Sequence, residues 1–235
     1  MINSNSHIEH AYEPMKNLFA ILIVFLPWSL RRIVLIKIFR YKLHPTARIG
    51  FSFVFPEQLE MGAHSSIGHL TVSKGLWRIQ MGVEAIIGNL NWITGFPMDD
   101  ESFFKADVGR RPELILGAHS AVTNRHMLDC TNSVRIGNFT TVAGTRSQIL
   151  THSIDLHQSR QTSKPIVIGE YCFVGTACVL LGGCALPDYS VLGACSLLNK
   201  QYSESYVLYA GNPAKPVKPL STKMGYFTRS TGFVH

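Results

Sequence analysis

The chain has 235 residues, of which 46% are hydrophobic and 16% charged, and this composition excludes an intrinsically disordered protein. Its formal net charge of +7 is localised. Between Pro14 and Pro56 there are seven basic residues and no acidic one, whereas the rest of the chain has 15 residues of each sign. This distribution argues against a basic nucleic-acid groove along the whole fold, and we expect no nucleic-acid partner.

The basic segment, residues 1–44, is expected to be helical and amphipathic. Its longest uncharged apolar run, Leu18–Trp28, has 11 residues and is shorter than the roughly 18–20 that span a bilayer. The acidic residues before this run and the pair Arg31-Arg32 after it do not fit a secretory signal peptide. Two interpretations stay open. Residues 15–42 lie on an anionic membrane face, or the segment is a helical cap on the fold or on a neighbouring subunit.

Residues 45–220 are expected to form one β-helix domain, followed by a short polar tail over residues 221–235. Six-residue units recur at 47–50 (the first, partial one), 61–72, 81–92 and 116–147.

Two stretches break this repeat. Residues 95–113 are charged and rich in turn residues, and residues 148–165 contain two histidines. Because the repeats supply the scaffold, we expect the interruptions to carry function.

The clearest repeat runs from Ile168 to Leu197 as IGEYCF, VGTACV, LLGGCA, LPDYSV and LGACSL. The first position is always aliphatic and the fifth is always Cys or Ser. A period of six fits neither an amphipathic helix nor an alternating strand, but it fits a coil in which each hexad makes one short strand and then turns. The large residue fills the interior and the small residue the tight corner. We therefore predict an all-β solenoid of the parallel β-helix type.

Cysteines occupy the small position in three consecutive hexads, at Cys172, Cys178 and Cys184. Since consecutive hexads face three different ways, their thiols should not converge on a metal, and we expect them to pack as small buried hydrophobes. The chain has five cysteines and no Cys-rich framework, which indicates a reducing compartment. We therefore expect a cytoplasmic protein, peripheral to the inner face of the cytoplasmic membrane if the first interpretation of residues 15–42 holds.

The hexads, the loop LTHSIDLHQSR, the following KPIVIG and the motif AGNPAKPVK together resemble the hexapeptide-repeat acyltransferases. The closest resemblance is to sugar and polysaccharide O-acetyltransferases of the galactoside and colanic acid acetyltransferase type. It covers residues 116–220 well and residues 45–94 loosely. The resemblance implies a left-handed parallel β-helix, a homotrimer with sites between subunits, and acetyl transfer from acetyl-CoA to a sugar hydroxyl without a metal. Residues 95–113 have no counterpart in the small acetyltransferases, so the acceptor class stays open.

The resemblance places the general base at His152. A sugar hydroxyl is too weak an acid to ionise unaided, and a neutral imidazole can accept its proton during attack on the thioester. His157 is expected to contact the loop or the acceptor. Asp155 either orients a histidine or is a solvated loop carboxylate. On the hexads before this loop, acceptor contacts are implied for Asn124, Arg125 and Asp129, with a plain polar outer face as the alternative for Arg125.

For the CoA moiety, the resemblance implies contacts with small hexad residues that let the pantetheine arm approach the backbone, and with lysines near its phosphates. These residues are Gly175, Thr176, Gly193, Ala194, Lys200, Lys215 and Lys218. The alternatives are that any β-helix needs small corner residues, and that surface lysines are merely solvated.

Two other functions stay open on the same solenoid. The first is a zinc enzyme of the γ-type carbonic anhydrase kind, whose histidines are shared between subunits. His64 and His69, like His152 and His157, are spaced by five residues. The second is a non-catalytic trimeric scaffold.

Overall fold

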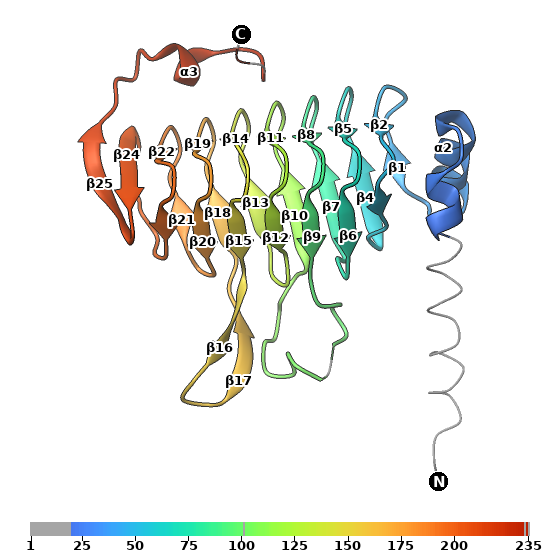
Figure 1. The fold of residues 1–235 in the computed structure, drawn as a ribbon, viewed down its shortest axis with the longest axis horizontal. Coiled ribbons are helices and arrows are strands. Elements are labelled where there is room, and N and C mark those ends of the chain that lie inside the picture. Colours follow the sequence, from blue (N-terminus) through green and yellow to red (C-terminus); the bar gives the residue numbers. More distant parts are fainter. Residues whose placement is uncertain (1–19, 101, 233, 235) are drawn as a thin grey trace.

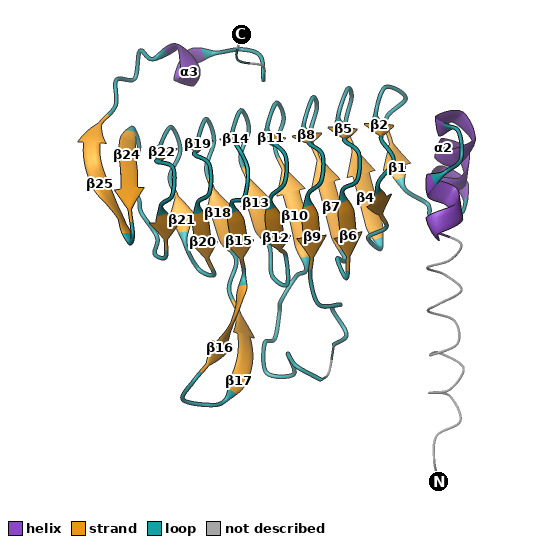
Figure 2. Ribbon diagram, in the orientation of Figure 1, coloured by secondary structure: helices purple, strands orange, loops and turns teal. Residues whose placement is uncertain are grey.

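A computed structural model describes residues 20–100, 102–232 and 234, and it forms a β-helix with three parallel sheets (Figures 1 and 2). Sheet A contains β1 (Lys42–Leu43), β4 (Gln58–Met61), β7 (Arg78–Met81), β10 (Glu113–Leu116), β13 (Val134–Ile136), β18 (Ile166–Ile168) and β21 (Ala185–Leu186). Sheet B contains β2 (Arg48–Ile49), β5 (Ser66–Ile67), β8 (Ile86–Ile87), β11 (Ala121–Val122), β14 (Thr141–Val142), β19 (Phe173–Val174), β22 (Val191–Leu192), β24 (Val207–Gly211) and β25 (Ala214–Pro219). Sheet C contains β3 (Phe53–Val54), β6 (Val72–Lys74), β9 (Trp92–Thr94), β12 (Met127–Asp129), β15 (Gln148–Leu150), β20 (Val179–Leu181) and β23 (Leu197–Leu198).

Each coil visits the three sheets in the order A, B, C and so has three corners, which we call the A–B, B–C and C–A corners. Strands in one sheet pair in parallel with those of the next coil, except at the C-terminal end of sheet B, where β24 and β25 pair antiparallel. Ile168 of β18 pairs with Leu186 of β21, and Val174 of β19 pairs with Leu192 of β22. These residues are the aliphatic first positions of the hexads and are at most 1% exposed. The predicted interior of stacked aliphatic rows is confirmed.

The small fifth positions lie at the corners, as predicted. Cys172, Cys178 and Cys184 are buried at an A–B, a B–C and a C–A corner respectively, so their thiols do not converge. The Cys172 thiol donates a hydrogen bond to the carbonyl of Pro187, and the Cys178 thiol to that of Gly193. Burial raises the pKa of Cys172 and of Cys184 to about 12, which keeps both thiols protonated and unreactive.

One row of corner residues carries stacked rings. His119, Phe139, Tyr171 and Tyr189 lie at four successive A–B corners and Tyr206 directly before β24, and all five adopt a positive φ. Their ring centroids are 4.6 to 5.2 Å apart and their planes are nearly parallel. The spacing matches that of hydrogen-bonded strands, so one coil sets the position of the ring on the next.

The C-terminal segment runs back along this ring row and contains α3 (Gly225–Thr228), as Figure 1 shows. Phe227 packs edge-on against Tyr189 and Tyr206, and the Arg229 guanidinium lies 3.8 Å from the Tyr226 ring centroid. The tail is therefore a packed strap for its described residues, and not only a polar extension.

The opposite end of the β-helix is covered by α2 (Trp28–Lys37), preceded by helical residues 20–24. Arg31 is 2% exposed and donates to the carbonyls of Gly50 and Ser52, while Leu35 packs into the core. Burial lowers the pKa of Arg31 to about 10, so the side chain is still charged at neutral pH. A helical cap is thus present, although residues 1–19 lie outside the described part. No helix among the described residues is long and apolar enough to cross a membrane.

Two excursions leave the β-helix at C–A corners (Figure 1). Residues 95–112 connect β9 to β10, and a hairpin of β16 (His152–Asp155) and β17 (Arg160–Ser163) follows β15. The predicted second interruption began too early, because Gln148–Leu150 is the regular strand β15 paired on both sides. The two excursions are joined by Asp107, whose carboxylate accepts hydrogen bonds from the backbone N–H and the hydroxyl of Ser163.

Replacing a corner glycine should test how tightly the coils stack. A Cβ on Gly137 would lie 2.5 Å from the backbone carbon of Gly169 on the next coil, where only backbone could yield. We expect Gly137→Ala to lower the free energy of unfolding by about 1–3 kcal/mol, as overpacking does in closely packed interiors. Gly225→Ala is the matched control, because its Cβ meets nothing within 4 Å. Urea denaturation followed by circular dichroism measures both, and equal stability of the two variants would contradict the expectation.

Candidate active site

His152 lies at a C–A corner, where β15 ends and the hairpin begins. Its Nδ1 is 2.7 Å from Oδ2 of Asp129, and the backbone N–H groups of His152 and Thr151 donate to the same oxygen at 2.9 and 2.8 Å. Asp129 ends β12, the neighbouring strand of sheet C, and its backbone position pairs with Leu150. Coil stacking therefore brings together two residues that lie 23 positions apart in the sequence.

The Asp129 carboxylate is built into the fold. The residue is 5% exposed, and its Oδ1 accepts hydrogen bonds from the backbone and the hydroxyl of Thr131. Burial by itself raises the pKa of Asp129, but the hydrogen bonds from His152 and Thr131 outweigh it and bring the pKa down to about 2. Asp129 is therefore ionised at neutral pH. The acceptor contact that the family resemblance implies for this residue stays a prediction; what the structure shows is that its carboxylate holds His152.

The pair fixes the chemistry of the imidazole. An ionised carboxylate can only accept, so Nδ1 of His152 carries the donated proton and Nε2 is the basic nitrogen. The hydrogen bond to Asp129 raises the pKa of His152, burial lowers it in part, and the net shift is upward. This arrangement makes Nε2 a stronger proton acceptor than that of an unpaired histidine.

The 95–112 excursion forms an aromatic wall beside His152. The rings of Phe96 and Phe104 meet the imidazole edge-on, with centroids 5.8 and 6.3 Å away. Arg110 holds this wall in place. Its guanidinium donates to the carbonyls of Phe96 and Pro97 and lies 4.6 Å from the Phe104 ring centroid. The sequence analysis expected this excursion to carry function without naming a role, and the structure places its Phe96 and Phe104 rings against the candidate base.

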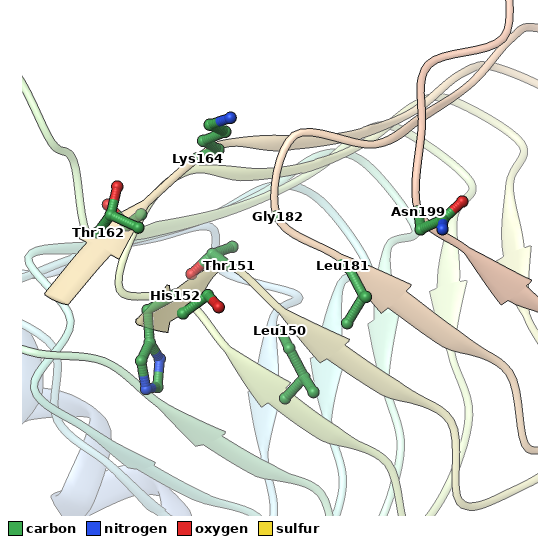
Figure 3. Close-up of a pocket in the computed structure, with 10 residues that line it drawn as sticks. Leu150, Thr151, His152, Thr162, Lys164, Leu181, Gly182 and Asn199 are labelled. Carbon is green, nitrogen blue, oxygen red and sulfur yellow. The ribbon is translucent and has the colours of Figure 1, made fainter. Parts of the chain in front are cut away.

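A pocket of about 480 Å³ opens beside His152 (Figure 3). It is lined by Leu150, Thr151, His152, Ser153, Thr162, Ser163, Lys164, Leu181, Gly182 and Asn199. Leu150 and Leu181 come from neighbouring strands of sheet C and lie between His152 and Asn199 in Figure 3. The pocket combines an apolar floor with hydroxyl, amide and ammonium groups, which suits a partly polar organic ligand.

Most of the residues predicted to contact CoA lie outside the His152 pocket of the same chain. Four of them, Gly175, Thr176, Gly193 and Ala194, stack at the B–C corners of two successive coils, at the far end of the sheet C strands from His152. Lys215 and Lys218 lie on β25 at the end of sheet B. Lys200 alone lies on the C–A side, next to Asn199 of the pocket, with Nζ 5.0 Å from the Tyr202 ring centroid.

The predicted acceptor contacts are also separated. Asn124 and Arg125 lie at a B–C corner, where Oδ1 of Asn124 accepts from the backbone N–H of Asn89 on the preceding coil. Asp155 and His157 are at the end of the hairpin. Oδ1 of Asp155 accepts from the backbone N–H groups of His157 and Gln158, so this carboxylate shapes the turn, and Asp129 is the residue that orients His152.

The histidines of the zinc alternative are dispersed in one chain. His64 lies at an A–B corner and His69 at a B–C corner, and Nδ1 of His69 accepts from the backbone N–H of Phe51. Within the described residues no three His, Cys, Asp or Glu side chains are placed to hold a metal ion together.

Comparison with known proteins identifies the fold. No family model matches the sequence, and no curated protein matches it either. Among solved structures, the polysialic acid O-acetyltransferase OatWY superimposes with a TM-score of 0.54 at 16% identity, covering 76% of this chain and 84% of that one. The polySia-specific acetyltransferase NeuO gives a TM-score of 0.46 at 18% identity over 76% and 80% of the two chains. AntD, an N-acyltransferase from Bacillus cereus in complex with dTDP and 3-hydroxybutyryl-CoA, gives 0.48 at 12% identity over 83% and 89%.

The likeness to OatWY shows the fold of this chain, which is the left-handed parallel β-helix of hexapeptide repeats. The fold class expected from the hexads is thereby confirmed.

Substitution of Asp129 should change the titration of His152. In Asp129→Asn the carboxylate that favours the imidazolium is gone, so the pKa of His152 should fall. Titration of ¹³C-labelled histidine by NMR measures this pKa, with the signal assigned by its loss in His152→Gln. Asp155→Asn is the control and should leave the pKa of His152 unchanged. An unchanged pKa in a folded Asp129→Asn protein would show that the pair does not set the basicity of His152.

Proposed function

We propose that this protein transfers an acyl group, by default acetyl, from acyl-CoA to a hydroxyl of a sugar or polysaccharide precursor. The observation that carries the proposal is the Asp129–His152 pair, a buried ionised carboxylate that fixes the tautomer of a half-buried imidazole. The hexapeptide-repeat fold supports it, since the structure named OatWY that shares this fold is a polysialic acid O-acetyltransferase.

The chemistry follows from the free nitrogen of the pair. Nε2 of His152 accepts the proton of the acceptor hydroxyl while the hydroxyl oxygen attacks the thioester carbonyl, so no alkoxide forms in solution. When the tetrahedral intermediate collapses, the C–S bond breaks and the imidazolium returns its proton to the leaving CoA sulfur. Asp129 holds Nδ1–H throughout and stabilises the transient positive charge.

We further propose that the complete site forms between copies of the chain in a homotrimer. From Thr176 at a B–C corner to Gly182 at the pocket the chain crosses sheet C in six residues, a span of up to about 20 Å at about 3.3 Å per residue. An acyl-CoA lying on the small corner residues of one copy would therefore be far from His152 of that copy. It would meet His152 of a neighbour if the B–C corners of one copy face the C–A corners of the next.

The acceptor is proposed to enter the pocket beside His152. Lys164, Asn199 and the hydroxyls of Ser153 and Thr162 line this pocket and offer hydrogen bonds to a sugar. Asn124 and Arg125 could join it only from a neighbouring copy.

Because acyl-CoA is a cytoplasmic substrate in this proposal and the chain has five unpaired cysteines, we propose a cytoplasmic location.

His152→Ala should remove the base and lower kcat by roughly 10²–10⁴-fold, while acyl-CoA binding changes little, because proton removal belongs to the transition state. His157→Ala is the control at the hairpin end and should retain most activity. In the wild type, kcat should fall as the pH drops through the pKa of His152, which lies above the ordinary value of about 6.5. Thiol release from acetyl-CoA against a panel of sugars and nucleotide sugars provides the assay.

Equal losses in His152→Ala and His157→Ala would contradict the assignment of the base. Stoichiometric zinc in protein purified without a histidine tag would favour the carbonic-anhydrase alternative, and unaltered turnover in His152→Ala would remove His152 from the mechanism.

The trimer proposal predicts a particle of about 78 kDa from three copies of the 26.2-kDa chain, measured by light scattering. A sharper test mixes two inactive variants. Ala194→Trp should block the exposed B–C corner, and His152→Ala removes the base. If each site uses both corners from different copies, co-expression should restore part of the activity, because some interfaces then combine two intact halves. No recovery in mixed trimers would mean that each site belongs to one chain.

A further inference from the structure

The helical cap at the N-terminal end of the β-helix exposes large apolar side chains. Six of them are 46–72% exposed, and they belong to the helical residues 20–24, the connecting turn, α2 and the residue that follows α2. They are Ile21, Leu22, Phe25, Leu30, Ile33 and Ile38. Together with the exposed basic residues Lys37 and Arg48, we call them the cap surface. Single exposed apolar residues are ordinary, but six within 18 residues at one end of a molecule indicate an interaction site.

These side chains are not needed to attach the cap. On α2 the inward face carries Arg31 and Leu35, which are 2% and 1% exposed. Leu30, Ile33 and Lys37 lie on the opposite face, because residues three and four positions apart share one side of a helix. The helix is therefore apolar on both sides, and its outer side has no partner among the described residues.

The described segment that forms the cap and the first coil carries charges of one sign. Residues 20–56 contain no acidic side chain, so every ionised group there is positive. Arg31 and Arg32 are occupied by carbonyls of the first coil, among them those of Gly50 and Leu43. Arg40 and Lys42 share a pocket with Glu57 and Glu60 of the next coil, which offsets part of their charge. Lys37 and Arg48 are exposed cations at this end, and Arg48 also donates from Nη1 to the carbonyls of Pro45 and Ala47.

We propose that the cap surface docks on an anionic lipid bilayer, with the apolar side chains entering the interfacial region and the basic residues facing lipid phosphates. Either a bilayer or a second copy of the chain could cover these apolar side chains, and the charge pattern favours the bilayer. A second copy of the chain placed end to end would bring two acid-free, positive surfaces together, whereas an anionic bilayer complements both properties. The contact is peripheral, since no described helix could span the bilayer. This proposal concerns location and does not rest on the proposed acyl transfer.

Vesicle binding by the full-length protein tests the proposal. Flotation with vesicles of phosphatidylcholine plus phosphatidylglycerol should carry the protein upward at low salt, and vesicles of phosphatidylcholine alone should carry much less. The double variant Leu30→Gln/Ile33→Gln should weaken binding roughly ten-fold or more, because both side chains contribute apolar burial. Lys37→Gln and Arg48→Gln should each weaken it about five-fold, and this effect should disappear at high salt.

Val217→Gln is the matched control, since Val217 is 58% exposed but lies on β25 at the other end of the β-helix. It should bind vesicles as the wild type does, and circular dichroism should show that all variants are folded. Failure of the wild type to bind anionic vesicles, or equal binding by the double variant, would overturn the proposal. The proposal would also be overturned if the particle mass doubled in the wild type but not in Leu30→Gln/Ile33→Gln. That result would identify a second copy of the chain as the occupant of the cap surface. Thiol-release activity of the double variant in solution is expected to be unchanged, which separates this outcome from failure of the acyl-transfer proposal.

Discussion

The hydrogen-bonded register between successive coils positions every side chain of this β-helix. Apart from the antiparallel pairs β16–β17 and β24–β25, the strands pair in parallel with their equivalents one coil later, so a residue has neighbours set by the stacking and not by its immediate sequence. Inside, this register builds continuous aliphatic rows such as Ile136, Ile168 and Leu186. At the C–A corners it builds the candidate site, because β12 and β15 are neighbours and Asp129 thereby reaches His152, the first residue of β16.

The site depends on how the fold compensates a buried charge. A carboxylate with 5% exposure is unfavourable unless hydrogen bonds replace its lost hydration. Asp129 receives such bonds from Thr131, Thr151 and both the backbone and the ring of His152. The threonines and backbone N–H groups keep the carboxylate in place whether or not the imidazole is charged. The imidazole can therefore gain and lose a proton at Nε2 without rearrangement of its support.

The sequence predicted the parts of this structure that repeat. The interior rows and the corner cysteines follow from patterns that can be read over a few hexads. The helical cap was one of two interpretations of the basic apolar segment, and the candidate base His152 was implied by the family resemblance. The pairing of Asp129 with His152 was missed because it depends on coil register, which shifts where the hexads slip after LDCTNS. Counting three hexads per coil would have shown that Asn124 and Arg125 belong to a B–C corner and Asp129 to a C–A corner.

Two features, the aromatic wall and the row of stacked rings, have no local sequence pattern that predicts them. The aromatic wall depends on Arg110 reaching the carbonyls of Phe96 and Pro97, which are contacts of an aperiodic loop with itself. The row of stacked rings could not be predicted from the sequence for a different reason. Phe139 and Tyr171 stack at 4.6 Å, yet the β16–β17 hairpin lies between them in the chain and breaks the even spacing that would reveal the row. Where an excursion is inserted, the sequence spacing between stacked residues changes, and their contact can no longer be predicted from the repeat.

The stacking of coils also sets the axial distance between the N-terminal cap and the His152 pocket. His152 follows the fifth strand of sheet C counted from the capped end, so four strand spacings of about 4.8 Å place it roughly 19 Å along the axis from the first coil. The coils between the cap and the excursions share one cross-section and contribute no side chain to the His152 pocket. Removal or duplication of a whole coil there, such as the one from β4 to β6, would change the height of the pocket in steps of about 4.8 Å and leave its lining intact. The number of coils is thus an adjustable length, which evolution or an engineer can alter separately from the chemistry at the corner.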